Sequence, residues 1–102
     1  MKRKSLGVLV TSEKHGAHLN PLCCAAERKQ IALAVHLQGE GVRLCLQPKY
    51  QDMMTRVHLS ICHKSAEKLG LTGYLKTRYP GALTSDRNAS ISIRQCTRHI
   101  VL

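Results

Sequence analysis

The stretch VHLSICHKSAEKLGL, residues 57–71, decides the expected fold. Its first half alternates apolar with polar side chains, which is typical of a β-strand over residues 57–61. Its second half changes to helical spacing and ends at Gly70, a residue that commonly closes a helix. Strands that lead into helices are the units of α/β folds. Cys62 stands at the junction of the two elements.

Cys62 is the first candidate for chemistry. A thiol at the start of a helix faces unpaired backbone N–H groups and the positive end of the helix dipole, and both favour the thiolate. His63, Lys64 and Ser65 open the helix, so we expect them to stabilise a negative charge on the sulfur. The alternative is a small buried residue that ends a core strand, as most free cysteines are.

Two further strands are expected upstream of this stretch. Residues 5–11 and 31–38 are nearly continuous apolar runs, which is typical of parallel strands covered on both faces. Between them, Asn20 and Pro21 form a favourable helix start, because Asn caps free N–H groups and Pro is tolerated at the first helical position. We expect this helix to run from there to about Lys29.

The other segments carry weaker signals. Residues 42–46 fit either a strand or a short helix, and residues 49–56 and 77–88 are expected to be loops. Residues 90–93 and 99–102 have the alternation of short strands.

Strands separated by helices imply βαβ units with right-handed crossovers. We therefore expect one α/β domain over residues 1–102, a three-layer α/β/α sandwich with a small, mainly parallel sheet of about five strands. The core has to be built from aliphatic residues and methionine, because the chain has no Phe, no Trp and only three Tyr.

If the first three strands are parallel neighbours, the loops that follow them open on the same edge of the sheet. Polar and glycine residues of the first two loops would then surround the sulfur at the end of the third strand. Glycines there permit positive backbone angles or the close approach of another group. The expected rim of this pocket comprises Thr11, Ser12, His15, Gly39 and Gly41.

The charge is strongly basic, with 16 Lys and Arg against 6 Asp and Glu, a net charge of +10. Such a surplus attracts anions of any kind, including nucleic acids, acidic proteins and small anions. The basic residues are scattered and no aromatic residues interleave with them to stack on nucleobases. The sequence therefore does not favour a nucleic acid as the specific partner.

Five cysteines have spacings that match no disulfide framework, and no secretory signal precedes them. The apolar run at residues 6–10 follows basic residues but is too short for the core of a signal peptide. Nothing approaches the length of a membrane span. We therefore expect a cytoplasmic protein with reduced thiols and no membrane partner.

Other chemistry finds little support in the sequence. Five Cys and six His are ample zinc ligands, but their spacing forms no CxxC…CxxC or CxxC…HxxxH pattern. Close pairs of carboxylates, a GxSxG elbow and the glycine-rich phosphate loops are also absent from the sequence. We therefore expect no bound metal and no cofactor.

The order of the segments LGVLVT, HLNPLCCAAE, LQGEGV and SICHKSAEKLGLTG, within residues 6–75, resembles that of the DsrE/DsrF-like (DsrEFH-like) family of small sulfur-relay proteins. The resemblance implies that Cys62 carries a persulfide and passes its outer sulfur on, as a persulfide carrier or sulfurtransferase. It also implies sulfur donor and acceptor proteins as partners, and a homo- or hetero-oligomer. The alternative function is a non-catalytic basic α/β module that docks an acidic protein or a nucleic acid.

Overall fold

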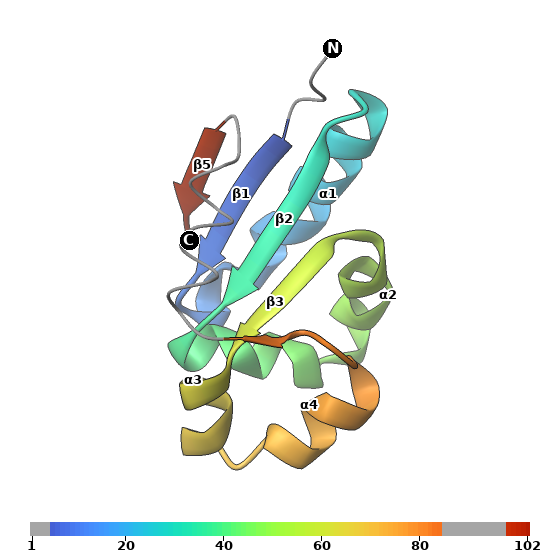
Figure 1. The fold of residues 1–102 in the computed structure, drawn as a ribbon. Helices are drawn as coiled ribbons and strands as arrows, with labels where there is room; N and C mark the ends of the chain where they lie inside the picture. The colour runs from blue at the N-terminus through green and yellow to red at the C-terminus, as the bar shows by residue number, and fades with distance from the viewer. Residues whose placement is uncertain (1–4, 85–97) are drawn as a thin grey trace.

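The structure is a computed structural model that describes residues 5–84 and 98–102. Its centre is one sheet of five parallel strands in the order β4-β3-β2-β1-β5 (Figure 1). The expected α/β class and parallel sheet are confirmed, and the arrangement is compatible with a three-layer α/β/α sandwich. The strands are β1 (Ser5–Val10), β2 (Ala32–Leu37), β3 (His58–Cys62), β4 (Leu83–Thr84) and β5 (Arg98–Val101).

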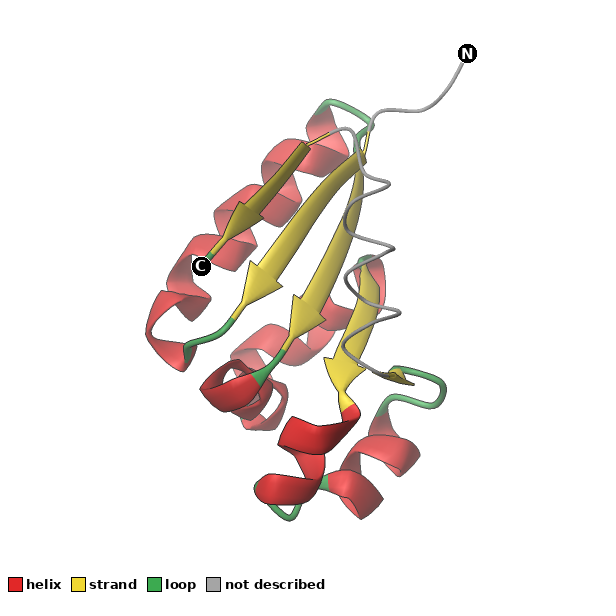
Figure 2. Cartoon of the chain, turned by 60° about the vertical axis from the view of Figure 1, so that its left-hand side comes forward, coloured by secondary structure: helices red, strands yellow, loops and turns green. Residues whose placement is uncertain are grey.

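Helices connect the first four strands. The helices α1 and α2 lie against one face of the sheet, whereas α3 and α4 lie beyond the carboxyl end of β3 (Figure 2). The expected strand at residues 90–93 falls outside the described residues. The helical elements are the 3-10 helices η1 (Glu13–His15) and η2 (Gly39–Leu46), and the α-helices α1 (Gly16–Arg28), α2 (Pro48–Arg56), α3 (His63–Lys68) and α4 (Thr72–Arg78).

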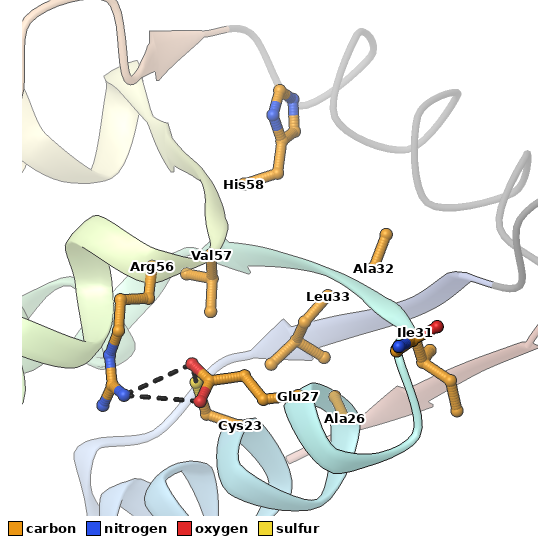
Figure 3. A pocket seen from close by; sticks show the side chains of 10 residues that line it. Cys23, Ala26, Glu27, Ile31, Ala32, Leu33, Arg56, Val57 and His58 are labelled. Carbon is orange, nitrogen blue, oxygen red and sulfur yellow. Dashed lines mark hydrogen bonds and ion pairs between the residues drawn. The ribbon is translucent and has the colours of Figure 1, made fainter.

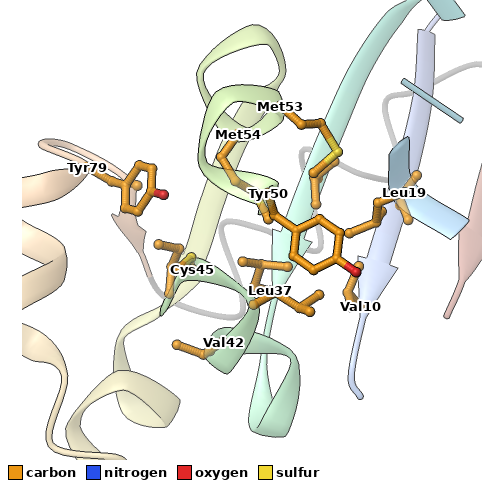
Figure 4. Packing of buried hydrophobic residues seen from close by; sticks show 14 of the residues in the cluster. Val10, Leu19, Leu37, Val42, Cys45, Tyr50, Met53, Met54 and Tyr79 are labelled. Atoms are coloured by element: carbon orange, nitrogen blue, oxygen red, sulfur yellow. The ribbon is translucent and has the colours of Figure 1, made fainter. Parts of the chain in front are cut away.

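The core lies between the sheet and these helices. Alternate residues of the inner strands, such as Val10 and Leu37, meet Leu19 of α1 and Tyr50 and Met53 of α2 (Figure 4). Burying one large apolar side chain stabilises a fold by about 1.5–3 kcal/mol. As expected, aliphatic and methionine side chains supply most of this core.

The start of α1 differs from the expectation. The helix begins at Gly16 rather than at Asn20, and Pro21 lies inside it. Gly16 is buried where a Cβ would lie 2.7 Å from Cδ2 of Leu44, so packing draws the helix start toward η2. Pro21 removes only one hydrogen bond, to the carbonyl of Ala17, which is exposed to water.

The expected loop at residues 49–56 is wrong, because α2 (Pro48–Arg56) occupies it. Pro48 stands at the start of the helix, where a missing N–H costs nothing, and Tyr50, Met53 and Met54 repeat at helical spacing on the buried face. The choice left open at residues 42–46 is settled by η2, a 3-10 helix.

The expected loop at residues 77–88 is also partly wrong. The helix α4 continues to Arg78, and β4 (Leu83–Thr84) pairs with the end of β3. Only two residues of β4 are described, and so short a strand offers little alternation to recognise in a sequence. Residues 85–88 lie outside the described residues.

Two helices end in the same way. After α3, Gly70 takes a φ of 70° while Leu71 N–H donates to the carbonyl of Ala66, as the sequence predicts for a terminal glycine. After α1, Gln30 takes a φ of 56° and Ile31 N–H donates to the carbonyl of Ala26. A left-handed conformation is easy for glycine and costly for glutamine.

Candidate functional site

The carboxyl ends of the strands share one edge of the molecule. Since β1, β2 and β3 are parallel neighbours, the segments that follow them all begin at this edge, as expected (Figure 2). The 3-10 helix η2, which follows β2, contacts both η1 after β1 and α3 after β3. The geometry at this edge is therefore set by η2.

Cys62 is the last residue of β3 and the N-cap of α3, the junction that the sequence predicts. Its Sγ atom accepts a hydrogen bond from the N–H of Ser65, with a donor–acceptor distance of 3.4 Å. Cys62 is only 2% exposed. Because its neighbour Ile61 belongs to the apolar core, strand alternation places Cys62 on the opposite face of the sheet.

Ser65 also joins α3 to the segment after β2. The N–H of Gly39 donates to the Ser65 hydroxyl oxygen at 2.8 Å. Gly39 has a φ of 55°, and a Cβ on Gly41 would clash with the carbonyl oxygen of Val10. The two glycines are therefore needed for a positive backbone angle and a close approach, as expected.

The first loop serves another part of this edge. Thr11 donates from both its N–H and its hydroxyl to the carbonyl oxygen of Leu102, at 2.9 and 3.1 Å. The Ser12 hydroxyl accepts from Lys14 N–H and caps η1, in which His15 lies. Since β2 separates β1 from β3, this loop starts about 10 Å from the end of β3. The structure thus brings Gly39, rather than the two hydroxyls, next to the residues around Cys62.

The basic neighbours of Cys62 are not its hydrogen-bond partners. His63 Nδ1 lies 3.2 Å from Oε1 of Glu67, one turn along α3, so its imidazole is directed toward that carboxylate. Lys64 is exposed to solvent. The contact that the structure gives to the sulfur is the backbone N–H of Ser65, three residues along the chain, as for an N-cap residue.

Cys23, Cys24, Cys45 and Cys62 are all free thiols. Burial raises the pKa of Cys45 to about 12. The pKa of Cys23 is also raised, first by burial and then by the Glu27 carboxylate, to which its thiol donates at 3.7 Å. Both groups therefore stay protonated at neutral pH and are weak nucleophiles.

A buried histidine lies on the same face as Cys62. His36 is 2% exposed, stands opposite Ser60 in the register of β2 and β3, and places Nδ1 2.9 Å from the Ser60 hydroxyl. Nδ1 of this buried histidine thus has a hydrogen-bond partner on the neighbouring strand. Ser60 had no sequence signal, because a cross-strand pair depends on register.

Residues 5–84 and 98–102 contain no group of three or more His, Cys, Asp or Glu side chains that could hold a metal ion. None of the helices described there has the length and apolar character needed to cross a bilayer.

No family model matches the chain, and no curated protein matches it.

Proposed function

We propose that the protein is a small sulfur carrier in which Cys62 bears the transferred sulfur as a persulfide. The observation that carries this proposal is the hydrogen bond from Ser65 N–H to Cys62 Sγ at the carboxyl edge of a parallel sheet. Ligands of open α/β sheets bind at this edge. The proposed transfer requires no cofactor, because the nucleophile is the thiol of Cys62 itself.

The N–H of Ser65 supplies a fixed hydrogen-bond donor to the sulfur. Hydrogen bonds to an ionised acceptor are roughly twice as strong as those between neutral groups, so this donor supports the sulfur while it attacks a persulfide. The exposed Lys64 and the net charge of +10 attract the anionic persulfide of a donor.

Loading is a thiol exchange that balances without an oxidant. The Cys62 thiolate attacks the outer sulfur of a donor persulfide, a new S–S bond forms at Sγ, and the donor S–S bond breaks. The electron pair of the broken bond leaves on the donor as its thiolate. The reverse exchange with an acceptor thiolate delivers the sulfur and regenerates Cys62.

Access to the sulfur requires a local movement, since Cys62 is only 2% exposed. The helix that it caps has six residues, too few to be stable by itself, so its first turn can open without unfolding the core. We expect loading to proceed through this local opening.

The test is to treat the reduced protein with a small-molecule persulfide donor and to map the added mass of ~32 Da, one sulfur atom, by peptide mass spectrometry. The proposal requires that the native protein carries the added sulfur on Cys62 and that the variant Cys62→Ser does not take it up. The matched control is Cys24→Ser, which lacks an exposed thiol and should still be loaded on Cys62. Persulfide on Cys24 alone, or equal loading of Cys62→Ser, would contradict it.

A second candidate, a basic binding module, is favoured by the distribution of charge. Four of the carboxylates in the described ranges lie beside basic side chains, whereas the lysines of these ranges are exposed to solvent. These acidic residues are Glu27, Glu40, Asp52 and Glu67. The whole chain carries a net charge of +10. A salt-sensitive mobility shift with nucleic acid, together with no persulfide on Cys62, would select this function.

A further inference from the structure

A pocket of about 350 Å³ opens at the end of the sheet opposite Cys62 (Figure 3). It lies between the C-terminal parts of α1 and α2, where β2 and β3 begin. Its volume is within the range of about 300–1,000 Å³ that is usual for sites of small ligands. The four residue steps of β3 from His58 to Cys62 separate the two regions by about 13 Å.

Two oppositely charged side chains line this pocket, Glu27 of α1 and Arg56 of α2. Arg56 Nη1 lies 3.3 Å from a carboxylate oxygen of Glu27, and Arg56 Nη2 lies 3.5 Å from one of Asp52, which is not part of the pocket wall. These contacts are long and the side chains are partly exposed, so the pairs contribute little to stability. A ligand can therefore engage Glu27 and Arg56 at little cost.

The wall beside these charges is apolar. Leu33 and Val57 point toward the space that Glu27 and Cys23 border, whereas His58 points to the other side of the sheet (Figure 3). Because burial and Glu27 raise its pKa, the Cys23 thiol adds no charge at neutral pH. The pocket thus combines one carboxylate, one guanidinium and an apolar surface.

We propose that this pocket binds a small zwitterion with an apolar side chain, the chemical class of an apolar α-amino acid. An ammonium group meets the Glu27 carboxylate and a carboxylate meets the Arg56 guanidinium, while the apolar part covers Leu33 and Val57. A ligand with a single charge gains one of these contacts and is repelled by the other partner. The opposite charges of Glu27 and Arg56 therefore select a ligand that carries both.

The experiment uses four probes on the native protein, observed by amide NMR. L-leucine carries both charges, isoamylamine lacks the carboxylate, isocaproate lacks the ammonium, and glycine lacks the apolar side chain. We expect saturable shifts at the amides of Glu27 and Val57 with L-leucine, and binding weaker by about tenfold with each of the other three. The absence of saturable shifts with L-leucine, or equal binding of isoamylamine or isocaproate, would overturn the proposal.

Two variants separate the pocket from the general surface. Glu27→Gln removes the carboxylate of the pocket, and Glu40→Gln removes one from the exposed ion pair with Arg43 in η2. We expect Glu27→Gln to weaken L-leucine binding about tenfold and Glu40→Gln to leave it unchanged. Equal binding by both variants, with native-like amide spectra, would place the ligand elsewhere and refute the assignment.

Discussion

The backbone N–H of Ser65 donates to Sγ of Cys62 at 3.4 Å, so a cysteine serves as the N-cap of α3. Serine is among the preferred N-cap residues, whereas alanine offers no acceptor. The variant Cys62→Ser is therefore expected to keep its free energy of unfolding within about 1 kcal/mol of the native protein, and Cys62→Ala to lose about 0.5–2 kcal/mol. Urea unfolding followed by circular dichroism measures both. A Cys62→Ser variant that does not fold would show that the residue has only a packing role.

The approach of Gly41 to the carbonyl of Val10 predicts a strong effect of a single methyl group. Gly41→Ala forces η2 away from β1, because backbone cannot yield as a flexible side chain does, and should lower the free energy of unfolding by about 1–3 kcal/mol. Gly73→Ala is the matched control, since a Cβ there has open space within α4, and it should raise stability by up to about 1 kcal/mol. Similar urea midpoints for the two variants would contradict this account of the carboxyl edge.

The two left-handed helix ends predict opposite effects. Gln30→Gly relieves a φ of 56° that favours glycine and should stabilise the protein by about 0.5–1 kcal/mol. Gly70→Gln imposes the same strain on a φ of 70° and should destabilise it by about 1–2 kcal/mol. Thermal unfolding compares the two variants, and a gain from Gly70→Gln would refute the assigned conformation.

Burial of Cys45 predicts a loss of stability in alkali. Its pKa is about 12 in the folded protein against 9.0 for a free thiol, so above pH 9 the unfolded chain releases a proton that the folded chain keeps. The stability contributed by this group is complete below pH 9 and falls toward pH 12, by up to about 1.4 kcal/mol per pH unit.

The control for this pH dependence is Cys45→Ala, which has a constant cavity cost but no thiol to ionise. Urea unfolding between about pH 8 and pH 11 should give a steeper decline for the native protein than for the variant. Parallel declines would show that Cys45 is not the group responsible.

The sequence was sufficient where one signal determined an element. The nearly continuous apolar runs predicted β1 and β2, and the change of period around Cys62 predicted the junction of β3 and α3. The helix α2 was missed because most of its residues are polar and only three are buried, Tyr50, Met53 and Met54. Their helical spacing becomes a signal only when Pro48 is taken as the first residue of a helix. The local helix-start signal at Asn20 and Pro21 led to a predicted start of α1 that is four residues too late. The observed start is determined by the tertiary packing of Gly16.

The candidate site was only partly predictable for a related reason. The position of Cys62 and the positive φ of Gly39 depend on local chain geometry, which a sequence carries. The bond from Gly39 to Ser65 and the ion pair of Glu27 with Arg56 join residues from separate elements. Such contacts depend on how the elements pack, and no spacing along the chain encodes them.

The measurement that tests the central claim most directly is the alkylation rate of Cys62 in the folded protein, with Cys45 as internal control. Both side chains are buried, Cys62 at 2% and Cys45 at 0% exposed, but Cys62 caps a six-residue helix while Cys45 lies in the apolar core. The account predicts that Cys62 reacts by local opening. Its alkylation rate should not change with denaturant concentration below the unfolding transition, and it should be at least about tenfold above that of Cys45. Equal rates for the two thiols, both rising with denaturant as global unfolding does, would show that Cys62 is a structural residue and contradict its role as the sulfur carrier.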